Sequence, residues 1–196
     1  MLKPGNRLNI SHLPIPCQKQ TIRYHPPVRL DRRQTLFLVR FAVLLLVFFC
    51  VIWLGPVDRN VIAPFTRGLA RVSAVVLNLF GERVIVFGSV IQGRGFAVDI
   101  KGGCNGVEAV LLLCAAIAAF DAPWRARVLG LVAGSIALMS FNIVRIVSLY
   151  MIGERWRQLF ETFHLAVWQT IMFAVAASIF ALWSGRFASR HVAART

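Results

Sequence analysis

The stretch VLGLVAGSIALMSFNIVRIVSL, residues 128–149, decides the fold class, and Arg145 is its only charged residue. At about 1.5 Å per residue, a helix of this length crosses a hydrocarbon layer of ~30 Å. Residues 34–54 and 165–183 form two similar runs, and residues 105–120 form a shorter one that neighbouring residues complete. We therefore predict an all-α integral membrane protein with about four transmembrane helices.

The composition of the whole chain agrees with a membrane location. Apolar residues make up 58% and charged residues 15%, against roughly 45–50% and ~25% in soluble domains. The formal net charge of +14 would suit a nucleic-acid-binding protein, but the basic residues flank the apolar runs instead of forming one face. The sequence thus predicts the lipid bilayer as a partner and no nucleic acid.

Two segments between the first and second spans differ from the spans themselves. Residues 57–80 predict an amphipathic helix on the membrane or on the other helices, with a fifth span as the alternative. The runs 84–87 and 96–100 are β-like, and glycines around them indicate a small hairpin or extended loop. The apolar stripe expected on the amphipathic helix consists of Val61, Phe65, Leu69, Val72, Val76 and Leu79.

The domain organisation follows from where the polar residues lie. Residues 1–33 are basic and proline-rich, which predicts a disordered cytoplasmic tail; residues 34–185 form the membrane-embedded domain, and residues 186–196 a second basic tail. Thirteen Lys and Arg residues fall on the side of the two termini and eight on the other side. By the positive-inside rule, both termini are expected in the cytoplasm, with 55–103 and the polar loop 150–163 outside.

This topology brings three reactive residue types to one depth on the outer side. Cys104 stands at the outer end of the second span, and His164 directly precedes the fourth. Arg145 lies in the third span, roughly 6 Å below its outer end at the helical rise. The other histidines fall in the predicted tails, so His164 is the one outer histidine.

The three residue types suit nucleophilic catalysis. The start of a helix favours a thiolate at Cys104, and His164 would exchange its proton. Arg145 would stabilise an oxyanion, and a charge inside a span suggests function because its burial is costly. Each residue alone also has a structural explanation: a packed thiol, an interfacial imidazole, and an arginine that reaches the headgroups.

Three polar neighbours are candidate supporting residues. Glu108, four residues after Cys104 on the same helix face, would pair with Arg145 or orient His164. Asn142, three residues before Arg145, would act as a further donor or form an interhelical hydrogen bond; Asn105 follows the cysteine directly. Glycines 102, 103 and 106 would let a substrate backbone approach the sulfur.

No cofactor and no metal site is expected. The four cysteines form no Cys-x-x-Cys pair, and no phosphate-binding or dinucleotide-binding glycine motif occurs. A Cys50–Cys104 disulfide remains an alternative at this point. A non-enzymatic membrane assembly or transport component is the alternative function, in which Arg145 and Glu108 form a buried structural pair and Cys104 is incidental.

The order of these motifs resembles the exosortase/archaeosortase family. The run GCNGVEA at 103–109 resembles its cysteine motif, NIVRI at 142–146 resembles its Asn-x-x-Arg motif, and His164 resembles its histidine position. The similarity extends from about residue 36 to 183. The short chain and the CNGVE form are most similar to the exosortase H subgroup.

The resemblance implies a sortase-like cysteine transpeptidase or protease of the bacterial inner membrane. Its substrates would be secreted proteins whose C-terminal signal consists of a short motif, a hydrophobic span and a basic cluster. The resemblance further implies cleavage at the periplasmic side through a thioester on Cys104. His164 would serve as acid and base, and Arg145 as a contact to the transition state or a substrate carboxyl.

Overall fold

The computed structural model describes residues 31–193, and side chains as far as residue 186. In chain order the elements are α1 (Arg32–Ile52), α2 (Gly55–Val57), the π-helical turn η1 (Asp58–Ile62), α3 (Ala63–Leu79), β1 (Ile85–Phe87), β2 (Val90–Gln92), β3 (Ala97–Asp99), α4 (Val107–Ala119), α5 (Trp124–Arg155), α6 (Arg157–Thr162), the π-helical turn η2 (Phe163–Val167) and α7 (Trp168–Ala193). The predicted tail 1–30 lies outside the described residues. Residues 186–193, expected as a second tail, continue helix α7.

The predicted fold class is confirmed. Among the described residues, three helices are long and apolar enough to cross a membrane: Arg32–Ile52, Trp124–Arg155 and Arg157–Arg186. The remaining predicted span, second along the chain, is α4, an apolar helix of 13 residues. That length corresponds to about 20 Å, so α4 needs the turn that precedes it to reach the depth of its neighbours.

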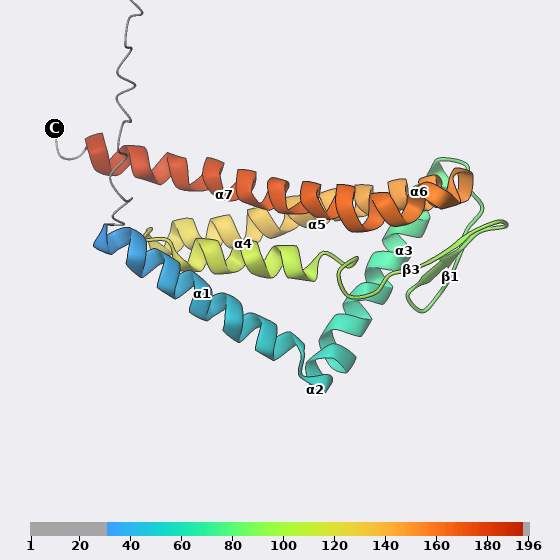
Figure 1. Cartoon of the computed structure of the whole chain (residues 1–196), viewed down its shortest axis with the longest axis horizontal. Coiled ribbons are helices and arrows are strands. Elements are labelled where there is room, and N and C mark those ends of the chain that lie inside the picture. The colour runs from blue at the N-terminus through green and yellow to red at the C-terminus, as the bar shows by residue number, and fades with distance from the viewer. Residues whose placement is uncertain (1–30, 194–196) are drawn as a thin grey trace, which may run out of the picture. The chain divides into compact units, whose positions relative to one another are not determined.

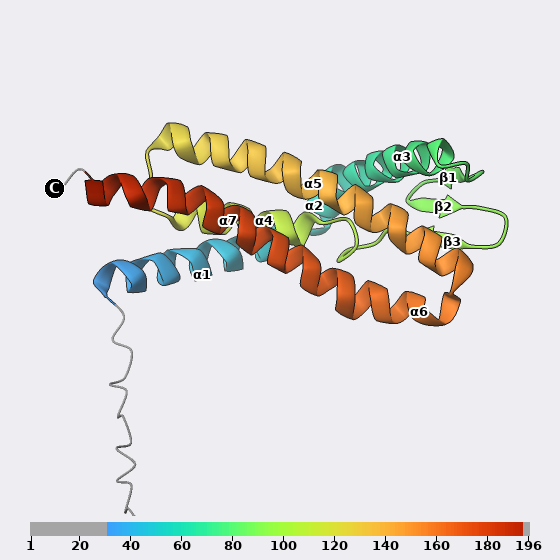
Figure 2. The same cartoon turned by 90° about the horizontal axis from the view of Figure 1, so that it is seen from above.

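Helix α4 lies at the centre of the helical packing. It runs beside α1, α5 and α7, which Figures 1 and 2 show from two directions. Leu113 and Ile117 of α4 are fully buried against Leu138 of α5 and Met172 of α7. Helix α1 contributes no buried residue, so most of its apolar surface remains available to lipid.

Helix α3 turns most of its predicted apolar stripe away from the other helices. Of the expected apolar stripe only Leu69 is buried, whereas Phe65, Val72 and Leu79 are exposed. The buried face consists largely of small residues: Thr66, Leu69, Ala70, Ser73, Ala74 and Leu77. Small side chains allow the close helix approach that membrane proteins use, and bulky apolar side chains can face lipid instead. Of the two surfaces predicted for the apolar stripe, the other helices are thus excluded and the membrane remains.

A small antiparallel sheet of order β1-β2-β3 covers one end of α3 and α5. The strands at 85–87 and 97–99 confirm the two predicted β-like runs. Strand β2, which pairs Ile91 with Val98, was not predicted. Its central Ile91 is fully buried with Leu77 and Tyr150, so the sheet is part of the core.

Residues 150–163, predicted as a polar outer loop, are largely helical. Helix α5 continues to Arg155, breaks at Trp156, and α6 begins at Arg157. The helix extends because Tyr150 and Gly153 are buried against the sheet, where the ring of Phe96 contacts both. The connection between the two long helices is thus one residue, which holds their ends together.

Candidate active site

Cys104 lies in a tight turn between β3 and α4, which we call the Cys turn (residues 101–106). Its backbone N–H donates to the Lys101 carbonyl at 3.0 Å. Gly103 and Gly106 have φ angles of 81° and 74°, a region that favours glycine. A Cβ on Gly106 would stand 2.7 Å from Met139 and 2.8 Å from Asn142, so the turn packs directly on α5.

Two buried asparagines hold the backbone of the Cys turn. Asn105 accepts from the Val107 N–H at 3.1 Å and donates to the Thr66 hydroxyl at 3.3 Å. Asn142 donates to the Cys104 carbonyl at 3.4 Å. Asn105 thus links the turn to α3 and bonds the first N–H of α4. Asn142 links the turn to α5. Both asparagines thus hold the segment that carries the cysteine.

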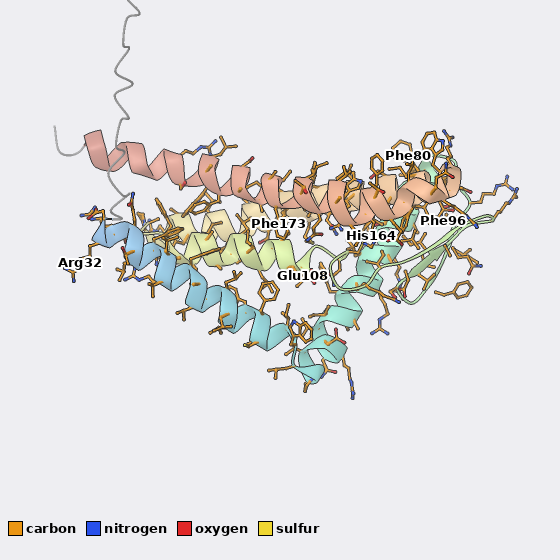
Figure 3. The ribbon with its side chains drawn as sticks, viewed as in Figure 1. Arg32, Phe80, Phe96, Glu108, His164 and Phe173 are labelled. Atoms are coloured by element: carbon orange, nitrogen blue, oxygen red, sulfur yellow. The ribbon has the colours of Figure 1, made fainter. Side chains whose placement is uncertain are left out.

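The thiol of Cys104 contacts the imidazole of His164. The Sγ–Nε2 distance is 2.9 Å, although the residues are sixty positions apart. Cys104 is 5% exposed. His164 lies in the π-helical turn η2, a geometry common at functional sites, and Phe160 packs on its ring with centroids 5.5 Å apart. Figure 3 shows His164 close to the start of α4, where Glu108 is labelled.

Arg145 is buried beside this pair and keeps an unsatisfied donor. It is 2% exposed, and its Nη2 donates to Gln169 Oε1 at 3.4 Å. Its Nε is buried without a hydrogen-bond partner. A buried guanidinium with a free donor is suited to receive an oxygen of a bound molecule.

Gln169 is a residue that the sequence analysis missed. It lies on the same continuous helix as His164, one to two turns further on, so this helix contacts both the cysteine and the arginine. The available signal was an amide inside an apolar span, which is costly unless it bonds another helix.

Glu108 does not play the part expected for it. Its Oε1 accepts from the Gly103 N–H at 2.8 Å. Within the described part of the chain the ion pairs are Lys101–Asp99 and Arg127–Asp121. The Arg145–Glu108 ion pair, on which the non-enzymatic alternative depended, is therefore not formed. The Glu108 carboxylate instead holds the Cys turn through the backbone N–H of Gly103.

The described residues contain no group of three metal-ligating side chains. Cys50, Cys104 and Cys114 are free thiols, with Cys50 exposed and Cys104 buried. The Cys50–Cys104 disulfide that the sequence left open is thus absent, and the sulfur of Cys104 is available for chemistry.

Three environmental effects act on the Cys104 thiol. Burial raises its pKa, the positive charge of Arg145 lowers it, and the negative charge of Glu108 raises it again. Burial is the largest effect, so the pKa lies above its usual value and the resting form is the neutral thiol. The thiol therefore depends on a base, and the adjacent imidazole is placed to accept its proton.

We expect the alkylation rate of Cys104 to report these charges. Because its pKa is raised, the rate should increase with pH and reach half its maximum above the pH typical of a free cysteine. Glu108→Gln keeps an acceptor for Gly103 and removes the negative charge, so the midpoint should fall. The measurement is iodoacetamide modification against pH, quantified by mass spectrometry of the peptide that contains Cys104.

Asp99→Asn is the matched control for that prediction, because Asp99 is a carboxylate near the turn that pairs with Lys101. Its midpoint should equal that of the unaltered chain. A midpoint that rises in Glu108→Gln would contradict the assigned electrostatics.

The fold and the site together define a multi-pass membrane protein with a Cys–His pair held at the ends of its helices. The family model described as "Transmembrane exosortase (Exosortase_EpsH)" matches residues 32–182. The chain therefore belongs to the exosortase family, which confirms the resemblance seen in its motifs. Exosortases are membrane sorting enzymes of the cysteine-peptidase kind. No curated protein and no solved structure gave a significant match.

Proposed function

We propose that this protein is a cysteine transpeptidase or protease that cleaves the C-terminal sorting signal of secreted proteins. The signal would consist of a short motif, a hydrophobic span and a basic cluster, and the cut would occur at the outer face of the bacterial inner membrane. Cys104 is the proposed nucleophile, His164 the acid and base, and Arg145 the oxyanion contact. Family membership supports the sorting role in general.

The observation that carries this proposal is the 2.9 Å contact between Cys104 Sγ and His164 Nε2. A nucleophile within hydrogen-bond reach of a base is the arrangement that covalent catalysis requires. The unpartnered Nε of Arg145 adds a buried donor on the same side of the bundle. The Cys turn supports the geometry, since Glu108 and Asn142 bond its backbone at Gly103 and Cys104. The Asn105 side chain adds bonds to Val107 and Thr66.

The first half of the reaction forms a thioester. The Cys104 thiol gives its proton to His164 Nε2, and the sulfur attacks the scissile carbonyl carbon. The negative charge that develops on the carbonyl oxygen is stabilised by Arg145. When the tetrahedral intermediate collapses, the C–N bond breaks and the leaving amine takes the proton from His164.

The second half transfers the acyl group. An amine acceptor or water attacks the thioester carbonyl and gives a proton to His164. Collapse of the second tetrahedral intermediate releases the Cys104 sulfur, which regains that proton. The products are a new amide or a carboxylic acid on the secreted protein, and the separated tail signal.

Hydroxylamine offers a direct test of the thioester. Membranes that contain the full chain and a tail-signal substrate are incubated with excess hydroxylamine, a strong nucleophile that attacks thioesters. The released substrate should carry a C-terminal hydroxamate at the cut site, detected by mass spectrometry of its last peptide. Cleavage that continues under these conditions with a carboxylate alone would contradict an acyl intermediate on Cys104.

A further inference from the structure

A cavity of about 950 Å³ adjoins the Cys turn. Its walls come from the end of α1, the helix that runs through α2, η1 and α3, the β1–β2 turn and the start of α4. Figure 1 shows how α1 and α3 diverge from α2, with the start of α4 between them. Gly102 and Asn105 line the cavity, whereas Cys104 and His164 do not. It is therefore separate from the catalytic pair.

Two arginines of the cavity lack ion-pair partners. Arg59 and Arg67 lie eight residues apart on one continuous helical segment, and both line the cavity together with Thr66 from the same face. Neither belongs to the two ion pairs found among the described residues. The predicted orientation places these arginines outside, where the positive-inside rule gives basic residues no role. Both side chains are exposed, so their charges are available to a bound molecule.

The cavity lies at the depth of lipid headgroups. Helix α1 is long enough to cross the hydrocarbon layer, so its end at Ile52 and Trp53 marks a membrane boundary. Trp53 lines the cavity and is 84% exposed, as expected of a residue in an interfacial aromatic belt. The side of α1 that leads to this point is apolar and exposed, including Val47 and Val51, which suits acyl chains.

We propose that this cavity binds the headgroup of an anionic glycerophospholipid such as phosphatidylglycerol. Arg59 and Arg67 would hold the phosphodiester, because guanidinium groups bind phosphate oxygens in pairs. Two carboxylates also line the cavity, Asp58 and Glu108. They would accept hydrogen bonds from the glycerol hydroxyls of the headgroup. Basic pockets beside membrane helices recognise lipid headgroups by this chemistry. The acyl chains would lie along α1.

Trp53 supplies the readout. The full chain in phosphatidylcholine micelles is titrated with phosphatidylglycerol whose acyl chains carry bromine, which quenches nearby indoles, and the Trp53→Phe variant gives the background. We expect Trp53 to be quenched at least tenfold more readily by brominated phosphatidylglycerol than by brominated phosphatidylcholine. The double variant Arg59→Gln/Arg67→Gln should reduce that preference roughly tenfold to thirtyfold.

Arg83→Gln/Arg94→Gln is the matched control, since these two exposed arginines line a different, smaller cavity. It loses the same charge and should keep the lipid preference. Cys104→Ala should also keep it, so the outcome is independent of the proposed catalysis. Equal quenching by the two lipids, or an equal loss in both double variants, would overturn the proposal.

The same experiment distinguishes two other molecules that could occupy the cavity. Soluble glycerol phosphate that displaces the brominated lipid at comparable concentration would show that the site binds phosphate and not a lipid. A short acidic peptide that binds in phosphatidylcholine through Arg59 and Arg67, without any preference for phosphatidylglycerol, would assign the cavity to a polypeptide. Either result would overturn the lipid assignment.

Discussion

Replacing Cys104 with alanine should abolish processing of a co-expressed tail-signal substrate. The proposed reaction passes through a bond to this sulfur, which alanine cannot form. Loss of a covalent nucleophile typically costs a factor of at least ~10³ in rate. The measurement is the fraction of substrate converted, followed by immunoblotting of the shortened product at several times after induction.

Cys114→Ala is the control for this prediction. Cys114 lies in α4, where its sulfur contacts Ser135 at 3.8 Å. The substitution therefore removes a thiol without altering the candidate site. We expect normal processing in that variant. Processing that persists in Cys104→Ala at the rate of the unaltered chain would refute the catalytic assignment and favour a non-enzymatic protein.

Replacing Arg145 with lysine should lower processing at least tenfold, and Arg145→Gln should lower it by about a hundredfold. Removal of one oxyanion contact costs about 10²–10³ in other enzymes. Lysine keeps the positive charge but offers a point charge in place of a planar set of donors, so it cannot bond Gln169 and a substrate oxygen in the same geometry. The measurement is the initial rate of substrate conversion per amount of enzyme.

The structural role of Arg145 requires its own readout, because the residue is 2% exposed and its removal leaves Gln169 without this donor. The amount of protein in the membrane and the alkylation of Cys104 should stay close to normal in Arg145→Lys. Arg155→Lys, at the exposed end of the same helix, should process normally. Equal rates in Arg145→Lys and the unaltered chain would contradict the oxyanion role.

The long apolar runs were predictable because a membrane span needs only length and hydropathy. Helix α1 begins and ends within two residues of the predicted 34–54 run. For α3 the sequence left open whether the apolar stripe contacts the membrane or the other helices, and the structure buries Ala70 and Ala74 while Phe65 faces outward. In a bilayer the burial of a side chain no longer follows from its hydrophobicity, so periodicity loses its usual meaning.

The candidate site was likewise predictable in part. Cys104, Arg145 and His164 were found by their chemistry and their position relative to span ends, and the structure brings the thiol and imidazole into contact. The partner of Glu108 was predicted wrongly, because sequence spacing favoured another charge while the actual partner is the Gly103 N–H. Gln169 was missed although it is an amide inside an apolar span, because its partner Arg145 lies on another helix 24 residues away.

The sequence by itself determined that this is a membrane protein, which residues are candidates for catalysis, and that they lie near the same ends of its helices. These properties depend on residue type and on distances along one chain segment. Only the tertiary structure decided what each residue touches: His164 against Cys104, Gln169 against Arg145, and Asn105 against Thr66. Such contacts join segments far apart in the chain, and their geometry depends on how closely the helices pack, which no single segment encodes.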